Sequence, residues 1–145
     1  MRSINLIVIH CSASDNPVDD SAERIKYLHS GNKKTKITWG KYETHCFGWA
    51  DIGYHYVITK DGRIHPGRPI EKAGAHVKGF NKSSIGICLT GDKEFTEEQF
   101  KALRHLIKEQ LIPNHQLSII DVMGHRDLNK GKSCPNFDVH EILRG

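Results

Sequence analysis

Three side chains of this 145-residue sequence have the chemistry and the expected positions of a metal site. His10 ends a strand-like segment, His125 follows another such segment, and Cys134 lies in the loop beyond it. Imidazole and thiolate bind Zn²⁺ at about 2.0 to 2.3 Å, and three protein ligands leave a fourth tetrahedral position open for water. The spacing matches no compact zinc finger, so the residues alone leave a second interpretation open: two loop histidines and an inert thiol.

The segments that must position these side chains alternate between strand and helix patterns. The apolar, β-branched run at 4–9 is typical of a strand buried on both faces, and Asp61-Gly62 predicts a hairpin turn. Strands are expected over 4–9, 54–58, 64–65, 84–90 and 118–122. Helices are expected over 21–28, capped by Ser21, over 96–112, opened by a capping box and ended by Pro113, and over 138–143. This order predicts an α/β fold with a central mixed sheet flanked by helices.

The chain is expected to form a single domain over 1–145 with a long inserted loop around 30–50. That stretch is polar and basic and shows no sustained hydrophobic period, and loops of this length are usually functional or mobile. Trp39 and Trp49 in it could stack on a sugar ring, or they could be local packing anchors.

Composition excludes several classes of protein. With 37% apolar and 26% charged residues the chain is neither disordered nor fibrous, and no apolar run approaches the length of a membrane span. The net charge of +4 comes without a dense basic stripe, so we expect no nucleic-acid partner. The N-terminal residues show no signal-peptide progression, so we expect synthesis in the cytoplasm. Reduced cysteines and a monomer are expected as well.

Several short segments occur in a fixed order around the candidate ligands. They read HCSA at 10–13, DIGYHY at 51–56, GAHVKGFN at 74–81, SIGI at 84–87, GHRD at 124–127 and KSCP at 132–135. Together they resemble the zinc-dependent N-acetylmuramoyl-L-alanine amidases of the second type, the superfamily shared by bacteriophage lysozymes with amidase activity and animal peptidoglycan recognition proteins. The resemblance covers about 120 of the 145 residues.

The resemblance implies roles for five residues. The zinc-ligand positions fall on His10, His125 and Cys134, and all three ligand types are retained. Recognition proteins that have lost hydrolysis commonly replace the cysteine, so its presence favours an enzyme. The catalytic positions fall on Tyr54 and Lys132. Lys132 is expected to stabilise the oxyanion, and Tyr54 to hydrogen-bond the attacking water and help move its proton.

Three further residues have two interpretations each. His76 and Asn81 lie in the Gly-rich segment that borders the substrate groove in the family, so we expect substrate contact; the alternative is a loop held by its own hydrogen bonds. Asp127 either orients a ligand histidine or ties down its own loop. Strand alternation predicts that Cys11 packs on the face opposite His10 and that His55 is a buried, hydrogen-bonded histidine.

The resemblance therefore predicts an enzyme with one Zn²⁺ that hydrolyses the amide bond between N-acetylmuramic acid and L-alanine in bacterial peptidoglycan. Its expected place of action is the cell wall, reached after release or delivery, as for a phage or prophage endolysin or a delivered effector. The alternatives are a non-hydrolytic peptidoglycan-binding module and a cysteine peptidase that uses Cys134 and a histidine. The stretch 30–50 is longer than the matching connection in phage-type relatives, which leaves substrate preference open.

Overall fold

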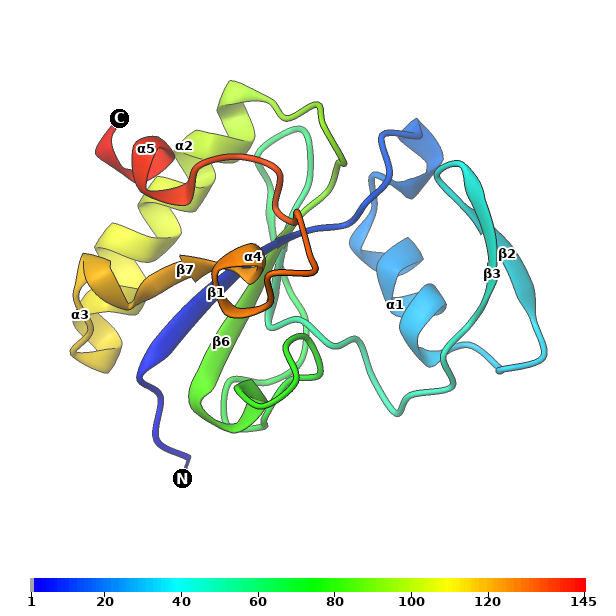
Figure 1. The fold of residues 1–145 in the computed structure, drawn as a ribbon, viewed down its shortest axis with the longest axis horizontal. Helices are drawn as coiled ribbons and strands as arrows, with labels where there is room; N and C mark the ends of the chain where they lie inside the picture. The colour runs from blue at the N-terminus through cyan, green and yellow to red at the C-terminus, as the bar shows by residue number, and fades with distance from the viewer. Residues whose placement is uncertain (1) are drawn as a thin grey trace.

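A five-stranded sheet runs through the protein in the computed structural model, which describes residues 2–145 (Figure 1). The strands are β1 (Leu6–Cys11), β4 (Tyr56–Ile58), β5 (Ile64–Pro66), β6 (Ser84–Leu89) and β7 (Val122–Gly124), in the order β5-β4-β6-β1-β7. β1 is parallel to β6 and to β7, and β4 is parallel to β6, whereas β4 and β5 form the antiparallel hairpin. The predicted α/β class with a mixed central sheet is confirmed.

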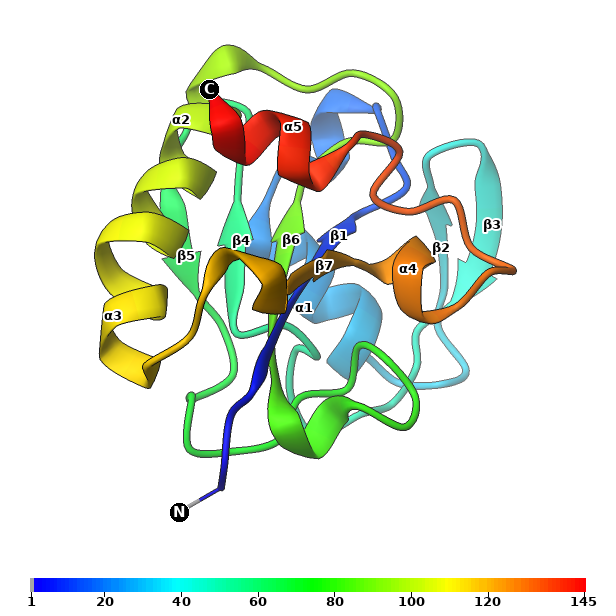
Figure 2. The ribbon, with the colours of Figure 1, turned by 60° about the vertical axis from the view of Figure 1, so that its left-hand side comes forward.

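Helices cover both faces of this sheet (Figure 2). One face packs against α2 (Glu97–His105), a π-helical segment (Leu106–Leu111), α3 (Ile112–His115) and α5 (Val139–Arg144). The other face carries α1 (Ala22–Ser30) and the second hydrophobic cluster. Because side chains alternate along β1, Ile7 and Ile9 pack on the face covered by α2 and α5, and Val8 lies on the opposite face. His10 lies on the same face as Val8.

The stretch 30–50, predicted as a loop, contains a two-stranded sheet of β2 (Lys36–Trp39) and β3 (Tyr42–His45). Ile37 and Trp39 are buried against α1, whereas their neighbours along β2 are exposed. The prediction failed because a four-residue alternation is too short to stand out from loop sequence. The indole N–H of Trp39 donates to the carbonyl oxygen of Ser12 at 2.6 Å, so Trp39 is a packing anchor.

The helix N-caps predicted from the sequence are confirmed, unlike the loop predicted over 30–50. The Ser21 hydroxyl accepts the backbone N–H of Arg24 at the start of α1, and Thr96 and Gln99 form the predicted capping box of α2. Pro113 does not end the helical run, because it stands in the first turn of α3, just after the π-helical segment, where a missing N–H is tolerated. The predicted strand at 118–122 is wrong over most of its length: 119–121 form a 3-10 turn, and β7 begins at Val122.

Within the described residues, no helix has the length and apolar character needed to cross a lipid bilayer. The cysteines are free thiols, as expected; Cys11, Cys46 and Cys88 are buried, and Cys134 is partly exposed.

Candidate metal centre

The carboxyl ends of β1 and β7 bring two histidines together. Ile9 pairs with Gly124 in a parallel register, so the following residues, His10 and His125, are neighbours at one edge of the sheet. Their ring centroids are 4.6 Å apart. His125 also begins the short helix α4 (His125–Leu128), after which the chain loops back over the same edge (Figure 1).

That loop carries Cys134 to the two histidines. The backbone N–H of Arg126 donates to the carbonyl oxygen of Cys134 at 2.8 Å, and the backbone N–H of Cys11 donates to Cys134 Sγ at 2.9 Å. One donor atom from each of His10, His125 and Cys134 lies within 4.8 Å of the other two. Ligands placed tetrahedrally at about 2.0 to 2.3 Å from Zn²⁺ are about 3.3 to 3.8 Å apart. The donor set therefore fits a zinc ion with small side-chain adjustments.

The protonation states of the histidines favour a cation. Burial, followed by the neighbouring histidines, holds the pKa of His10 well below its usual value. Burial and the charge of Lys132 lower the pKa of His125. Both imidazoles are therefore neutral near pH 7, which is the form that binds a metal.

The pKa of Cys134 shifts in the opposite direction from those of the two histidines. A side-chain hydrogen bond with the thiol of Cys11, followed by burial, raises the pKa of Cys134. A reactive nucleophilic cysteine needs a lowered pKa, whereas a metal ion deprotonates a coordinating thiol outright. The environment of Cys134 thus suits a metal ligand better than a nucleophile.

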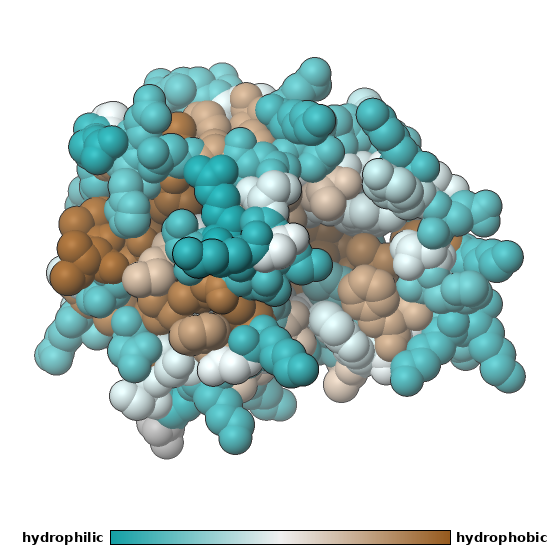
Figure 3. Space-filling model, in the orientation of Figure 1, coloured by the Kyte–Doolittle hydropathy of each residue, from teal (hydrophilic) through white to brown (hydrophobic). Residues whose placement is uncertain are grey.

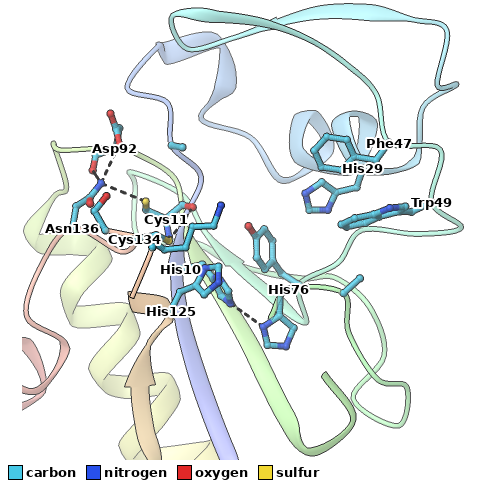
Figure 4. A pocket seen from close by; sticks show the side chains of 16 residues that line it. His10, Cys11, His29, Phe47, Trp49, His76, Asp92, His125, Cys134 and Asn136 are labelled. Carbon is cyan, nitrogen blue, oxygen red and sulfur yellow. Dashed lines mark hydrogen bonds between the residues drawn. The ribbon is translucent and has the colours of Figure 1, made fainter. Parts of the chain in front are cut away.

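The three donors open into a cleft of about 520 Å³. Figure 3 shows it as a hollow between the part of the molecule with β1 and β7 and the part with α1, β2 and β3. The wall on the α1 side is aromatic: His29, Phe47 and Trp49 lie with ring centroids 4.9 to 5.3 Å apart (Figure 4). The opposite wall is polar and includes Asp92, which accepts a hydrogen bond from Asn136 Nδ2 at 3.0 Å.

Tyr54 and Lys132 both line this cleft. The ring of Tyr54 is half-buried, with its centroid 5.1 Å from that of His10, and burial raises the pKa of its phenol well above the usual value. Tyr54 is therefore a neutral hydroxyl that can both donate and accept. Lys132 is exposed at the rim, close enough for its charge to lower the pKa of His125. All five residues that the resemblance singled out lie around one cavity.

His76 lines the cleft as well, but its ring faces protein groups. His76 Nδ1 lies 2.8 Å from His10 Nε2 (Figure 4), and His76 Nε2 lies 3.2 Å from Ser84 Oγ. Burial, followed by nearby histidines, lowers the pKa of His76 to about 3, so the ring is neutral. The structure therefore places His76 at the cleft in contact with a candidate metal ligand, and its contact with substrate stays a prediction.

Asn81 and Asp127 hold their own loops. Asn81 Oδ1 accepts the backbone N–H groups of His76 and Val77 at 2.8 and 2.9 Å, and Asn81 is not among the residues that line the cleft. Asp127 Oδ2 accepts the backbone N–H of Gly124 at 2.9 Å. Over residues 2–145, no hydrogen bond joins Asp127 to a candidate ligand. These are the hydrogen bonds that the alternative interpretation expects, because each short side chain reaches the backbone of its own turn. Substrate contact by Asn81 and an orienting role for Asp127 stay predictions.

The sequence did not indicate some of the residues that line the cleft as part of a site. His29 lies in the last turn of α1, buried next to Leu28, and a polar residue on the apolar face of this helix was the available signal. Cys11, expected only to pack, also lines the cleft beside Cys134. His55 is buried as predicted: its Nδ1 accepts the N–H of Gly86, and its Nε2 lies 2.8 Å from the carbonyl oxygen of Lys72.

Known proteins resemble this chain in sequence and in fold. The family model described as N-acetylmuramoyl-L-alanine amidase matches residues 1–137. The endolysin of Klebsiella phage KP32 is 33% identical over 141 residues, which cover 92% of this chain and 81% of that protein. The N-acetylmuramoyl-L-alanine amidase LysC from Clostridium intestinale URNW superposes with a TM-score of 0.78 at 28% identity, covering 99% of this chain and 85% of that one.

A complex of the peptidoglycan recognition proteins LCa and LCx with tracheal cytotoxin is also similar. It superposes with a TM-score of 0.73 at 26% identity and covers 99% of this chain and 82% of the other. The similarity therefore includes both a hydrolase and a recognition protein.

Proposed function

Because the chain belongs to the N-acetylmuramoyl-L-alanine amidase family, we propose that it is a zinc-dependent enzyme that hydrolyses the bond between N-acetylmuramic acid and L-alanine in bacterial peptidoglycan. The observation that carries the zinc assignment is the convergence of His10, His125 and Cys134, with donor atoms within 4.8 Å, in an open cleft. One ion is expected, held by these three residues.

An amide is a poor electrophile, so the site must activate water and stabilise the oxyanion. When bound, the ion supplies Lewis acidity and lowers the pKa of a coordinated water toward about 7. Cys11 holds the sulfur in place by donating its backbone N–H to Cys134 Sγ at 2.9 Å. The neutral imidazoles of His10 and His125 offer lone pairs without first losing a proton.

Two further side chains handle charge and protons. The neutral phenol of Tyr54 can hydrogen-bond the attacking water and pass its proton on, since its raised pKa keeps it from ionising. Lys132 places a positive charge at the rim of the same cleft, where negative charge develops on the scissile carbonyl oxygen. The aromatic wall of His29, Phe47 and Trp49 supports binding of the glycan or the peptide stem.

We also propose that the protein acts as a monomer on the cell wall after release or delivery, as an endolysin does. The similarity to phage endolysins supports this site of action.

Two other functions fit parts of the molecule. A binding module without hydrolysis would use the same cleft, but it has no need of a complete His, His, Cys donor set. A cysteine peptidase would need an activated thiolate, whereas the pKa of Cys134 is raised.

The test is digestion of purified peptidoglycan followed by mass spectrometry. The amidase releases stem peptides with a free L-alanine amino group and leaves glycan strands with intact muramic acid. A chelator should abolish release and added Zn²⁺ should restore it, while brief thiol alkylation of the zinc-loaded protein should have little effect. Binding without release would identify a recognition module, and activity that survives metal removal but not alkylation would identify a thiol enzyme.

A further inference from the structure

We propose that His76 is a positioning residue that presents His10 to the metal, through a hydrogen-bond relay that ends at the backbone carbonyl of Phe80. This inference rests on the proposed zinc site and concerns how that site is assembled. The first link joins His10 Nε2 to His76 Nδ1 at 2.8 Å (Figure 4). The relay continues from His76 Nε2 to Ser84 Oγ at 3.2 Å and from Ser84 Oγ to the carbonyl oxygen of Phe80 at 2.8 Å.

The last hydrogen bond determines which atom carries the hydrogen in each of the other two. A carbonyl oxygen only accepts, so the hydroxyl of Ser84 donates its hydrogen to Phe80. Ser84 Oγ then accepts from His76 Nε2–H, which leaves Nδ1 of the neutral His76 ring as an acceptor. His10 Nε2 must therefore carry the hydrogen that it donates to His76. The lone pair of His10 is left on Nδ1.

The opposite direction would leave His10 without a free lone pair. If Ser84 donated to His76 Nε2, the neutral His76 ring would carry its proton on Nδ1 and donate it to His10 Nε2. His10 would then be protonated on Nδ1, and both of its nitrogens would be occupied. Only the relay that ends at Phe80 lets His10 act as a ligand.

The remaining nitrogen of His10 faces the cleft. His10 is only 2% exposed, and His10 Nδ1 has no hydrogen-bond partner among residues 2–145. No fully buried side-chain nitrogen or oxygen atom of the described residues lacks a partner. Nδ1 must therefore belong to the small accessible part of His10, which lines the cleft.

The fold makes a slot for the ring of His76. A Cβ atom added at Gly86 would stand 2.7 Å from two atoms of this ring, and one added at Gly74 would stand 2.6 Å from a third. The backbone of His76 is held independently, because Asn81 Oδ1 accepts its N–H. Ring, backbone and tautomer are thus all constrained, as expected of a group that orients a metal ligand.

The experiment measures zinc affinity by competition with a fluorescent chelator in the full chain and its variants. His76→Ala should weaken zinc binding about 10- to 100-fold. His76→Asn, whose side-chain oxygen can replace Nδ1 as the acceptor, should recover most of the affinity. His45→Ala, at an exposed position on β3, is the matched control and should bind zinc as the parent does.

Ser84→Ala keeps both imidazole rings and removes only the hydroxyl, so it tests the relay even if His76→Ala fails to fold. It should weaken zinc binding on the order of 10-fold. Nitrogen-15 imidazole spectra of the zinc-loaded parent should show hydrogen on Nε2 of His10 and on Nε2 of His76. Hydrogen on His10 Nδ1, or unchanged affinity in folded His76→Ala or in Ser84→Ala, overturns the relay.

These outcomes are separate from failure of the proposed function. If the parent binds one zinc that Cys134→Ser loses, the metal site stands whatever the His76 variants do. If the parent binds no zinc, the proposed function falls, and the role of the relay falls with it.

Discussion

Replacing Lys132 by alanine tests the electrostatic part of the proposed mechanism. Lys132 lines the cleft and its charge is felt at His125, yet its side chain is exposed. Two unit charges about 4 Å apart interact by about 1 kcal/mol in water and about 4 kcal/mol near a protein surface. Removal of one donor to a developing oxyanion typically costs about 2.7 to 4 kcal/mol, which falls in the upper part of that interval.

We therefore expect Lys132→Ala to lower kcat about 10²- to 10³-fold. Zinc content should stay at one ion per chain, because Lys132 is not a ligand and its positive charge disfavours a cation. Lys132→Arg should keep part of the activity, since the charge remains. Lys130→Ala is the matched control, because Lys130 is also exposed but does not line the cleft.

The assay follows release of stem peptides from purified peptidoglycan under saturating substrate, with zinc measured by mass spectrometry on the same samples. A rate for Lys132→Ala within about threefold of the parent, against the expected loss, would remove this residue from the chemical step. Loss of zinc together with activity would instead show that Lys132 supports the metal site.

Three further predictions concern stability and binding. Burial lowers the pKa of His29 and of His55 to about 4 from an ordinary 6.5, so the unfolded chain takes up protons first as the pH falls. The free energy of unfolding of the metal-free protein, measured in urea, should be constant above pH 6.5 and decline toward pH 4; a constant value across that range would contradict these pKa shifts. Gly86→Ala places a Cβ atom 2.7 Å from the ring of His76, so it should cost about 1 to 3 kcal/mol in urea unfolding and weaken zinc binding. An unchanged urea midpoint and an unchanged zinc affinity would mean that the ring of His76 can move away from the added methyl group without cost. Trp49→Ala should raise KM for peptidoglycan fragments about 2- to 10-fold at unchanged kcat and zinc content, because it removes an exposed ring from the aromatic wall; an unaltered KM would place substrate elsewhere.

The sequence by itself determined the parts of this protein that depend on short-range chemistry. The caps at Ser21 and Thr96 bond to groups only three residues away, so the pattern predicted them correctly. The two candidate ligand histidines were visible at the ends of strand-like runs, and Cys134 in the loop beyond. The two-residue turn at Asp61-Gly62 likewise predicted the hairpin of β4 and β5.

Contacts between distant residues were decided only by the tertiary structure. Trp39 and Trp49 have the same chemistry in one segment, yet one is 7% exposed and bonded to Ser12 while the other is 38% exposed in the cleft. His76 lies 66 residues from His10, and no sequence pattern indicates which of its nitrogens faces that ring. A hydrogen bond forms only when its two heavy atoms lie within a narrow range of distance, and its direction depends on the acceptor at the far end of the relay. Those distances exist only once the strands have brought the segments together.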